Sequence, residues 1–566
     1  MLRRAVLWLD QRTGFPAAVG HLFAERIPGG ARWAYVFGSA LLALLAAQTL
    51  SGAALALSYS PSVASAWASV ARLELTPLGH LLRALHANGA TFTIAVVALH
   101  LLQTALFGAY RAPREMTWWF GLGLLGIVLA FALTGSLLPW DERGYWATRV
   151  TAGIAGTVPI LGRPLQSALQ GGPVLGNLSL TRFYALHAVL LPLLLLLVGA
   201  AHVAGVRRHG ITPPPSADVQ LDEPFWPRQA FYDAAFSLLL LAGLLALSLA
   251  KGAPLGAPAD PTGTAAPRPE WYFRPLFGLV TLVGGSLELV ATVVVPFCAA
   301  AFLFALPFLD RGARRSKATM AALLGGFAAA AALGLFSLAN DAKNPVFQRE
   351  QIASERRAKR ALRLARGGVP PEGGLALVQA QPEDRGRKLF SQRCLECHVL
   401  GGEGVSKGPR LDGYLSKAWL IGAVTHPESG DYFGNTKIRG MDSYENLGEG
   451  KLSALGDFLV SLRDVKGGPE TFSPAHDAGR RVFEQAGCSD CHSLKPGEAS
   501  LAPSLSRYGS TFWLSGFLRE PGSPLYYDKD NAMPEFGRSL TPQQLADLVA
   551  FLRTLAVPEE VLAKAP

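Results

Sequence analysis

Seven apolar stretches dominate the first 340 residues of this chain, and each is about 20 residues long with few or no charges. They lie near residues 34–57, 89–108, 118–138, 183–204, 231–250, 284–309 and 318–338. A helix needs about 20 apolar residues to cross the hydrocarbon core of a bilayer. The sequence therefore predicts a mainly α-helical chain that begins as a polytopic bundle of about seven transmembrane spans. The sixth stretch starts near residue 275, which leaves room for an extra turn or helix that does not span.

The net charge of +10 would suit a nucleic-acid partner, but the placement of the basic residues argues against one. Arginines cluster before the first stretch, after the second, after the fourth, and between the sixth and seventh. Under the positive-inside rule these loops are cytoplasmic, so the N-terminus lies in the cytoplasm. We therefore expect a multi-pass protein of a bacterial inner membrane, surrounded by lipid. Seven spans would leave the residues after about 340 on the extracytoplasmic, or periplasmic, side.

Two short motifs in this exported part, CLECH (394–398) and CSDCH (488–492), share the pattern C-x-x-C-H. The pattern is the attachment signature of c-type haem, in which both thiols bond to the haem and the histidine binds its iron. A single C-x-x-C could instead form a disulfide or half a zinc site, but two copies that each end in histidine favour haem. The predicted attachment residues are Cys394, Cys397 and His398 in the first copy, and Cys488, Cys491 and His492 in the second.

The surroundings of the two motifs repeat as well: GRKLFSQRCLECH aligns with GRRVFEQAGCSDCH, and LSALGDFLVSL aligns with LADLVAFLRTL. Met441 and Met533 lie 43 and 41 residues after the motif histidines, at matching places. A thioether is a soft sixth ligand for haem iron, whereas a lone methionine usually packs in a core; matching placement favours ligation. This half resembles a tandem class I cytochrome c, each domain a small all-α bundle around one haem. The expected parts are a linker at 341–383 and domains at 384–466 and 467–566.

Histidines stand near both ends of the second and fourth apolar stretches. His86 and His100 are 14 residues apart, and His187 and His202 are 15 apart. Polar side chains at membrane depth are costly and usually functional, although a lone histidine can simply be a satisfied hydrogen-bonding group. If the two helices are neighbours, His86 faces His187 on the outer side and His100 faces His202 on the inner side. Each pair would ligate one non-covalent haem b, and two such haems would carry electrons across the membrane.

Four glycines and two arginines extend this pattern. Small residues in membrane helices permit close approach, here of a porphyrin face, although ordinary helix packing is the alternative. The arginines stand near the ends of the histidine helices, where they could pair with haem propionates or act only as interfacial cations. The glycines are Gly38 and Gly52 in the first stretch and Gly121 and Gly135 in the third, and the arginines are Arg83 and Arg207.

Three segments carry a closer resemblance: LTGSLLPWDERGYWA (133–147), SLTRFYALH (179–187) and PEWYF (269–273). They resemble the cytochrome b core of the quinol-oxidising cytochrome bc and b6f complexes, over about residues 20–340. The 15-residue histidine spacing resembles the b6f branch, where cytochrome b6 and subunit IV are separate chains. The resemblance implies a four-helix haem-binding domain at 1–215 and a three-helix domain carrying PEWY at 216–340. The whole chain resembles a fusion of that cytochrome b with a dihaem cytochrome c.

The resemblance also implies an outer quinol site. It places Pro269, Glu270, Trp271 and Tyr272 there, together with Trp140, Asp141 and Tyr145 from the loop after the third stretch. Quinol oxidation releases protons, and Glu270 is a carboxylate in an otherwise apolar stretch, so it is the candidate base, with Tyr272 beside it. Without the motif, Glu270 would be interpreted as a loop carboxylate that pairs with Arg268 or Arg274.

The implied activity is that of a quinol–cytochrome c oxidoreductase subunit, with quinol and quinone as substrates. One electron would pass to a Rieske iron–sulfur protein and the c haems, the other across the b haems, with translocation of protons. The chain has no Rieske pattern of paired Cys and His motifs, so that protein would be a separate subunit. The resemblance further implies a homodimer, and a soluble or membrane cytochrome c or a terminal oxidase as acceptor. The alternative is a membrane-anchored electron carrier with b and c haems that serves another redox enzyme without a Rieske partner.

One position departs from the b6f pattern. Some members hold an extra haem through a cysteine near the start of the first span, where this chain has Tyr35 in RWAYVFG (32–38). No covalently attached extra haem is therefore expected near Tyr35.

Overall fold

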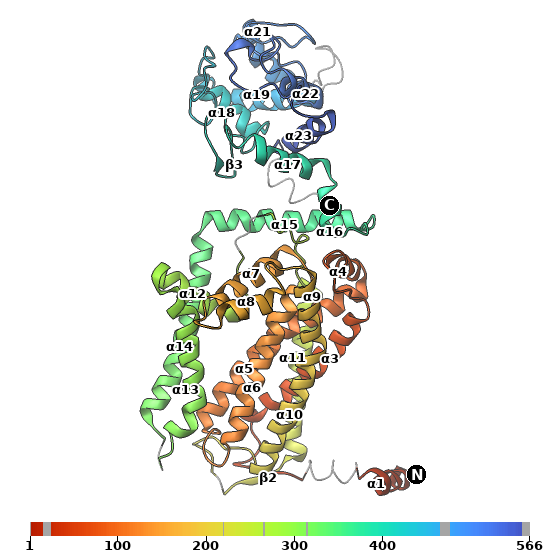
Figure 1. Ribbon diagram of the computed structural model, residues 1–566, viewed down its shortest axis with the longest axis vertical. Helices are drawn as coiled ribbons and strands as arrows, with labels where there is room; N and C mark the ends of the chain where they lie inside the picture. The colour runs from red at the N-terminus through yellow and green to blue at the C-terminus, as the bar shows by residue number, and fades with distance from the viewer. Residues whose placement is uncertain are drawn as a thin grey trace. The chain divides into compact units, whose positions relative to one another are not determined.

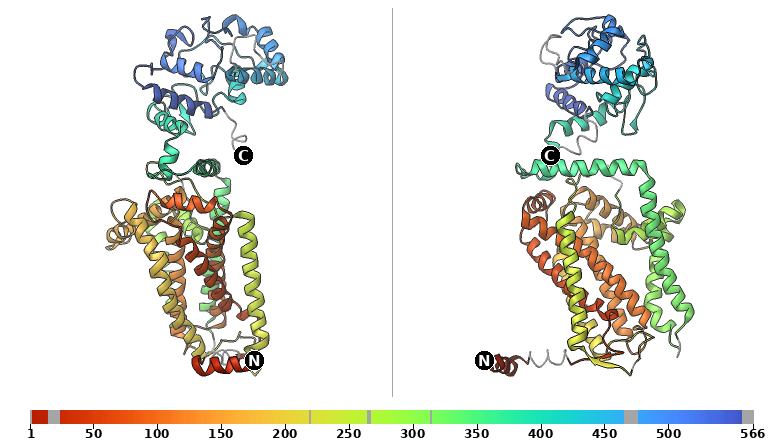
Figure 2. Two further views of the ribbon diagram at one scale, coloured as in Figure 1. Left: turned by 90° about the vertical axis from the view of Figure 1, so that its right-hand side faces the viewer. Right: turned by 180° about the vertical axis from the view of Figure 1, so that it is seen from behind.

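The computed structural model describes residues 2–14, 24–218, 220–263, 267–312, 315–464 and 476–556. Its helices are drawn in Figure 1 and, from two further sides, in Figure 2. The chain divides into two compact units, Met1–Leu375 and Ala376–Pro566. We refer to them as the membrane unit and the C-terminal unit and describe each by itself.

The prediction of seven membrane spans is confirmed, because the described residues contain seven helices long and apolar enough to cross a bilayer. The spans are Phe37–Ala56 (α3), Pro77–Phe107 (α5), Glu115–Leu137 (α6), Asn177–His209 (α9, a π turn and α10), Phe225–Lys251 (a π turn and α11), Val290–Leu309 (a π turn and α13) and Lys317–Lys343 (α14). The shorter apolar helix Trp271–Val283 ends in α12 (Arg274–Val283) and accounts for the extra helix expected near residue 275.

The first five spans pack around the histidine-bearing helices. α5 packs against α3, α6 and α11, and α6 packs in turn against α10. Buried apolar side chains supply these contacts: Ala40, Leu44, Val96 and Leu244 join α3, α5 and α11 in one cluster. α12 and α13 pack against α14, and α13 also meets α6 (Figure 1). The bundle therefore has a group of five spans followed by a group built from the last two.

The short elements between the spans fall on two sides of the bundle. β1 (Arg26–Pro28), before α3, pairs antiparallel with β2 (Asp222–Pro224), before α11. The connections after an odd number of spans share the opposite side, and they contain α4 (Ala66–Glu74), α7 (Glu142–Gly156), α8 (Gly162–Gln170) and α12. α15 (Pro345–Ala365) follows the seventh span on that same side, where Arg357 pairs with Glu142 of α7 at 3.2 Å.

Asp341, in the last turn of α14, holds the segment that begins with PEWY. Its buried carboxylate accepts a hydrogen bond from Arg268 Nε at 2.8 Å and another from Arg274 Nη1 at 2.7 Å. Arg274 also donates to Ser337 Oγ, one turn earlier in α14, at 3.2 Å. Two cations around one buried carboxylate offset the charge that burial alone would penalise. This joint fixes the start of α12 against the last span.

The C-terminal unit is helical and holds both C-x-x-C-H repeats around one hydrophobic core. The first repeat contains α17 (Pro382–Arg393), α18 (Lys417–Thr425) and α19 (Glu449–Ser461). The second contains α20 (Asp477–Gln485), α21 (Cys488–Cys491), α22 (Thr511–Arg519) and α23 (Pro542–Thr554). The first helix of each repeat packs against the last helix of the other, α17 on α23 and α20 on α19. The boundary predicted at 466/467 lies outside the described residues.

We expect Asp341→Asn to destabilise the membrane unit by about 3 kcal/mol, because it leaves two largely buried arginines without their counter-ion. The measurement is thermal or chemical unfolding of the purified protein in detergent, followed by intrinsic fluorescence. Lys343→Gln changes an exposed charge two residues further along α14 and is the matched control. Equal unfolding curves for the two variants would show that the joint contributes nothing.

Candidate functional site

The membrane histidines meet across the bundle in the predicted pairs. The rings of His86, from α5, and His187, from the π turn before α10, have centroids 6.1 Å apart with their planes at 72°. His100 and His202, near the other ends of the same two spans, lie within electrostatic range of one another. The structure thus brings together the four histidines that sequence spacing singled out.

A π turn brings the two histidine helices into register. His86 and His100 are 14 residues apart in one helix, whereas His187 and His202 are 15 apart. Leu186–Leu190 form the π turn, in which Leu191 N–H donates to the Leu186 carbonyl, five residues back. Pro192 follows and has no N–H to donate, which favours an irregular turn here. Because a π turn absorbs one extra residue, the two spans place their histidines at nearly the same separation.

Neighbouring helices fix the tautomer of three of these imidazoles. His202 Nδ1 is 2.9 Å from the Thr117 carbonyl, which can only accept, so Nδ1 carries the proton. His86 Nδ1 is 3.1 Å from Ser51 Oγ, and His187 Nδ1 is 3.0 Å from Thr134 Oγ1. Both hydroxyls also contact the backbone carbonyl four residues back, at 2.7 Å, which uses their single proton. The Nδ1–H tautomer leaves Nε2 free, as an iron ligand requires.

His100 differs from the other three membrane histidines. Its Nδ1 is buried and has no hydrogen-bond partner among the described residues. A buried polar atom without a partner is costly in an apolar bundle. The side chain of Gln103, three residues further along α5, contacts the ring instead.

Each predicted glycine lies against one of the four imidazoles. A Cβ atom built on Gly52 would be 2.9 Å from His86 Cε1, and one on Gly135 would be 2.7 Å from His187 Cε1. On Gly121 it would be 3.2 Å from His202 Cε1, and on Gly38 it would be 4.0 Å from His100 Cε1. Any side chain at Gly52 or Gly135 would therefore push an imidazole aside. Facing histidines, free Nε2 atoms and side-chain-free cradles fit two bis-histidine haems, and the porphyrin contact of the glycines stays a prediction.

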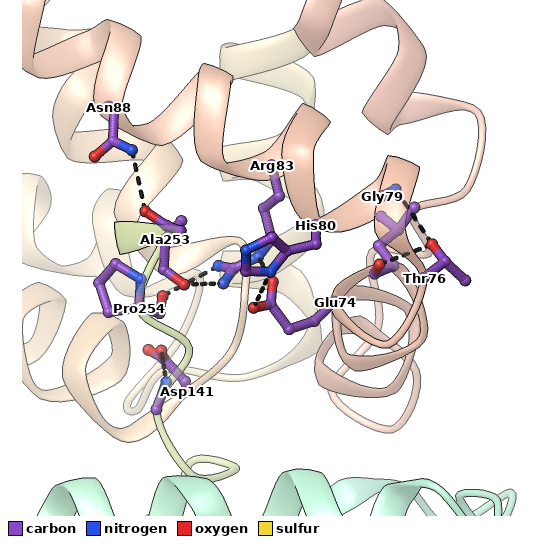
Figure 3. A network of polar contacts seen from close by, with 12 residues as sticks. Glu74, Thr76, Gly79, His80, Arg83, Asn88, Asp141, Ala253 and Pro254 are labelled. Carbon is purple, nitrogen blue, oxygen red and sulfur yellow. Dashed lines mark hydrogen bonds and ion pairs between the residues drawn. The ribbon is translucent and has the colours of Figure 1, made fainter. Parts of the chain in front are cut away.

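Arg83 belongs to a polar network at the α4 side of the bundle (Figure 3). Its Nε is 2.6 Å from Glu74 Oε2, and His80 Nδ1 is 2.7 Å from the other Glu74 oxygen. The two remaining nitrogens of Arg83 donate to the carbonyls of Ala253 and Pro254, in the loop after α11. This buried guanidinium therefore ties α4, α5 and that loop together, and its contact with a haem propionate stays a prediction. Arg207 pairs with Glu25 instead, at the β1 side.

Asp141 organises the loop after the third span. One carboxylate oxygen caps α7 by accepting Gly144 N–H at 2.8 Å, and the other accepts Gly256 N–H at 2.7 Å. Trp140 precedes it with a positive φ of 49° and packs edge-on against Tyr145, with ring centroids 5.5 Å apart. All three side chains are at most 5% exposed. In the structure they form a rigid joint between the third span and the loop after α11.

The PEWY segment leads into α12 on the same side. Pro269 and Glu270 precede a short helical turn, Trp271–Phe273, and the Glu270 side chain is exposed. Burial raises the pKa of the Tyr272 phenol, and the nearby Glu270 raises it further. Glu270 does not pair with Arg268 or Arg274, because both arginines bind Asp341. The PEWY segment rests on α12 and α14, whereas Trp140, Asp141 and Tyr145 rest on α7.

The two C-x-x-C-H histidines make the same hydrogen bond in both repeats. His398 Nδ1 donates to the Pro409 carbonyl and His492 Nδ1 donates to the Pro503 carbonyl, each at 2.7 Å. Burial lowers the pKa of both imidazoles, which favours the neutral form that binds iron. A Cβ atom on Gly408 would be 2.8 Å from His398 Cε1, so this ring also has a side-chain-free neighbour.

The cysteines and methionines of the C-terminal unit fit covalent haem. Cys394, Cys397, Cys488 and Cys491 form no disulfide, so their thiols are available. Burial, and then the neighbouring Cys397, raise the pKa of the Cys394 thiol to about 12. Met441 and Met533 are both partly buried and pack against the hydrophobic core. Their ligation of iron stays a prediction.

Family models of cytochrome b match the membrane unit. The model described as "Cytochrome b(N-terminal)/b6/petB" matches residues 91–258, and "Cytochrome b(C-terminal)/b6/petD" matches residues 258–355. Cytochrome b of Rhodobacter capsulatus is 30% identical over 342 residues, covering 55% of this chain and 78% of that protein. Cytochrome b of Rickettsia prowazekii is 31% identical over 319 residues, covering 55% of this chain and 79% of that protein. The chain belongs to the cytochrome b family.

Unlike a bare cytochrome b, this chain continues into a cytochrome c region. A family model described as "Cytochrome c" matches residues 476–556, in the second repeat. A solved structure described as "Hyperthermophilic respiratory Complex III" is 26% identical, with a TM-score of 0.52. The match covers 61% of this chain and 93% of the chain in that structure. The resemblance inferred from the sequence is confirmed: this is a polytopic redox subunit of the quinol oxidoreductase type, with haem b and haem c regions.

Sequence reasoning missed several residues that position the histidines of the membrane unit and of the C-x-x-C-H motifs. Ser51 and Thr134 lie one residue before Gly52 and Gly135, so the pattern Ser/Thr-Gly in both helices was an available signal. Pro409 and Pro503 each lie 11 residues after a motif histidine, and this equal spacing was the signal in the repeats. Thr117 acts through its carbonyl, which no side-chain pattern could reveal.

Gly52→Ala and Gly135→Ala should each remove about one of the two expected b haems, because the added methyl displaces His86 or His187. The measurement is haem b content of the purified protein by pyridine haemochrome analysis. Gly126→Ala, in the same helix as Gly135 but with nothing within 4 Å, is the matched control and should keep both haems. Full haem content in all three variants would contradict the cradle role of Gly52 and Gly135.

Proposed function

We propose that this fusion is the cytochrome b and dihaem cytochrome c subunit of a respiratory quinol–cytochrome c oxidoreductase. The observation that carries the proposal is the meeting of His86 and His187, whose ring centroids are 6.1 Å apart, in a chain that also holds two C-x-x-C-H motifs. A chain with these parts can accept electrons within the membrane and deliver them outside it. The family relation to complex III cytochrome b supports the same activity.

The membrane unit holds two haem b groups through His86 with His187 and through His100 with His202. The C-terminal unit holds two haem c groups through the cysteines and histidines of CLECH (394–398) and CSDCH (488–492), with methionine as the sixth ligand. When bound, these groups supply one-electron transfer across the membrane and out to an acceptor. No covalent extra haem is included near Tyr35, whose hydroxyl donates to the Pro28 carbonyl at 3.0 Å.

Glu270 accepts a proton from quinol at the outer site. Its exposed side chain lies near the half-buried phenol of Tyr272, so it can contact both a partly buried substrate and water. Pro269 and Trp271 form the same wall of the site, and Trp140, Asp141 and Tyr145 form the rigid wall on α7. Oxidation there sends one electron to a Rieske protein and the c region, and the other toward the cytoplasmic side. Protons are released outside and taken up inside.

The complex contains partners beyond this chain. A separate Rieske iron–sulfur protein takes the first electron, the cytochrome b chains form a homodimer, and a soluble or membrane cytochrome c or terminal oxidase is the acceptor. The chain lies in a bacterial inner membrane with its N-terminus in the cytoplasm. Seven spans support an extracytoplasmic C-terminal unit, because an odd number puts the two ends on opposite sides.

Haem stoichiometry tests the cofactor assignment. Redox-titrated visible spectroscopy and pyridine haemochrome analysis of the purified complex should give two b and two c haems per chain. A b-to-c ratio other than one to one would contradict the assignment.

Glu270→Gln should lower the rate at which quinol reduces cytochrome c about 100-fold, the low end of what a positioned general base contributes. The haem spectra should be unchanged, because Glu270 is not one of the predicted haem ligands. Glu372→Gln, an exposed carboxylate after α15, is the matched control and should retain the rate. An unaffected rate in Glu270→Gln, with no Rieske protein in the purified complex, would favour the membrane-anchored carrier instead.

A further inference from the structure

The C-terminal unit consists of two mixed bundles, each built from both repeats. α17, which leads into CLECH (394–398), packs against α23 (Figure 1). α20, which leads into CSDCH (488–492), packs against α19. α18 packs against α19, and α22 packs against α23. The middle and last helices of each repeat therefore belong to the same bundle as the first helix of the other repeat.

Aromatic pairs at aligned positions fix this exchange. Phe390 of α17 meets Phe551 of α23, with ring centroids 5.4 Å apart. Phe483 of α20 meets Phe458 of α19, with ring centroids 5.7 Å apart. Phe390 aligns with Phe483, and Phe551 aligns with Phe458, so the same contact is made twice, each time between repeats.

Glycines permit the close helix contacts of the exchange, and one ion pair makes the exchange specific. A Cβ atom on Gly386 would clash with the Asp547 carbonyl, and one on the aligned Gly479 would clash with the Ala454 carbonyl. Arg385, beside the first glycine, forms a two-pronged pair with Asp547 at 2.7 and 2.6 Å. In α19 the residue aligned with Asp547 is Ala454, which offers Arg385 no charge.

The two bundles are related by an approximate two-fold axis. Tyr414 hydrogen-bonds to Tyr508, its own counterpart in the other repeat. Phe433 packs against its counterpart Tyr527, with ring centroids 5.8 Å apart. A residue that meets its own counterpart marks a two-fold axis, so neither repeat forms this core alone.

The methionine segments follow the exchanged helices. Tyr444, three residues after Met441, donates its N–H to the Val424 carbonyl at the end of α18. α18 packs on α19, and α19 packs on α20, the helix that leads into the second motif. The segment that carries Met441 thus lies beside the second motif rather than being confined to the first.

The aligned segment of the second repeat is anchored in the same way. Phe536, three residues after Met533, donates its N–H to the Leu518 carbonyl at the end of α22 at 3.0 Å. Because α22 packs with α23 and α23 packs on α17, this segment belongs to the bundle of the first motif.

We propose that the sixth ligands are exchanged between the repeats. Met441 of the first repeat binds the iron of the haem attached at CSDCH (488–492), and Met533 of the second repeat binds the iron of the haem attached at CLECH (394–398). This inference rests on the proposed attachment of haem c at both motifs and goes beyond it by assigning each methionine to the other repeat's histidine.

The test uses the full chain with one c-type haem at a time. Cys488→Ser with Cys491→Ser leaves covalent haem only at the first motif. In this background Met533→Ala should abolish the weak long-wavelength absorption band of a ferric histidine–methionine haem, and Met441→Ala should leave it intact. With Cys394→Ser and Cys397→Ser, the two methionine variants should exchange roles. The b haems have two histidine ligands and do not contribute to this band.

The opposite pattern, loss of the band with the methionine of the same repeat, would overturn the exchange. Haem staining of the chain on a denaturing gel separates this result from failure of the proposed function. Absence of covalent haem from the unmodified chain would contradict the cofactor assignment, whereas two covalent haems with same-repeat ligation would contradict only the exchange.

A second measurement keeps all four haems in place. Arg385→Asp and Asp547→Arg should each lower the melting temperature of the C-terminal unit, followed by the same absorption band, and the double variant should recover most of the loss. If each repeat packed its own end helices, Arg385 would face Ala454 and the double variant would show no recovery. That result would also overturn the exchange.

Discussion

An imidazole that binds iron inside a membrane bundle needs a partner for Nδ1–H and an Nε2 atom left free. For three of the four membrane imidazoles the partner comes from a helix other than the histidine's own: Ser51 of α3 serves His86, and Thr134 and the Thr117 carbonyl of α6 serve His187 and His202. The axial positions of four helices must therefore match closely enough for these hydrogen bonds to form. The π turn at Leu186–Leu190 and the glycines beside the rings are the features that make this agreement possible.

Carboxylates with little solvent exposure position the loops that connect the spans. Asp141 joins the third span to the loop after α11, Glu74 binds Arg83 and His80, and Asp341 binds two arginines at the start of α12. Each of these groups is satisfied by backbone N–H groups or by cations, so each fixes a loop and has little capacity left for chemistry. Glu270 is different, because its side chain is exposed and its neighbouring arginines are occupied elsewhere. The division separates positioning carboxylates from the one proposed to move a proton.

The C-terminal unit uses its internal repeat as a means of assembly. Two copies of one bundle contain two copies of each helix surface, so the first helix of one repeat fits the last helix of either repeat. Exchange of equivalent elements is a low-cost route to association because no new interface has to be created. Here Arg385 and Asp547 favour one of the two arrangements, and the shared aromatic axis at Tyr414 and Tyr508 joins the halves. The two haem regions consequently share one core and are expected to fold together.

By itself the sequence determined the seven spans, the family, both C-x-x-C-H motifs and the four membrane histidines. These features depend on apolar length and on spacing along one helix, which are local properties of the chain. The tertiary structure decided which atoms serve those histidines, that Arg83 is bound by Glu74, and that Asp341 rather than Glu270 takes Arg268 and Arg274. It also decided which end helices pack together in the C-terminal unit. These outcomes depend on contacts between distant segments, and the spacing of residues along the chain does not reveal them.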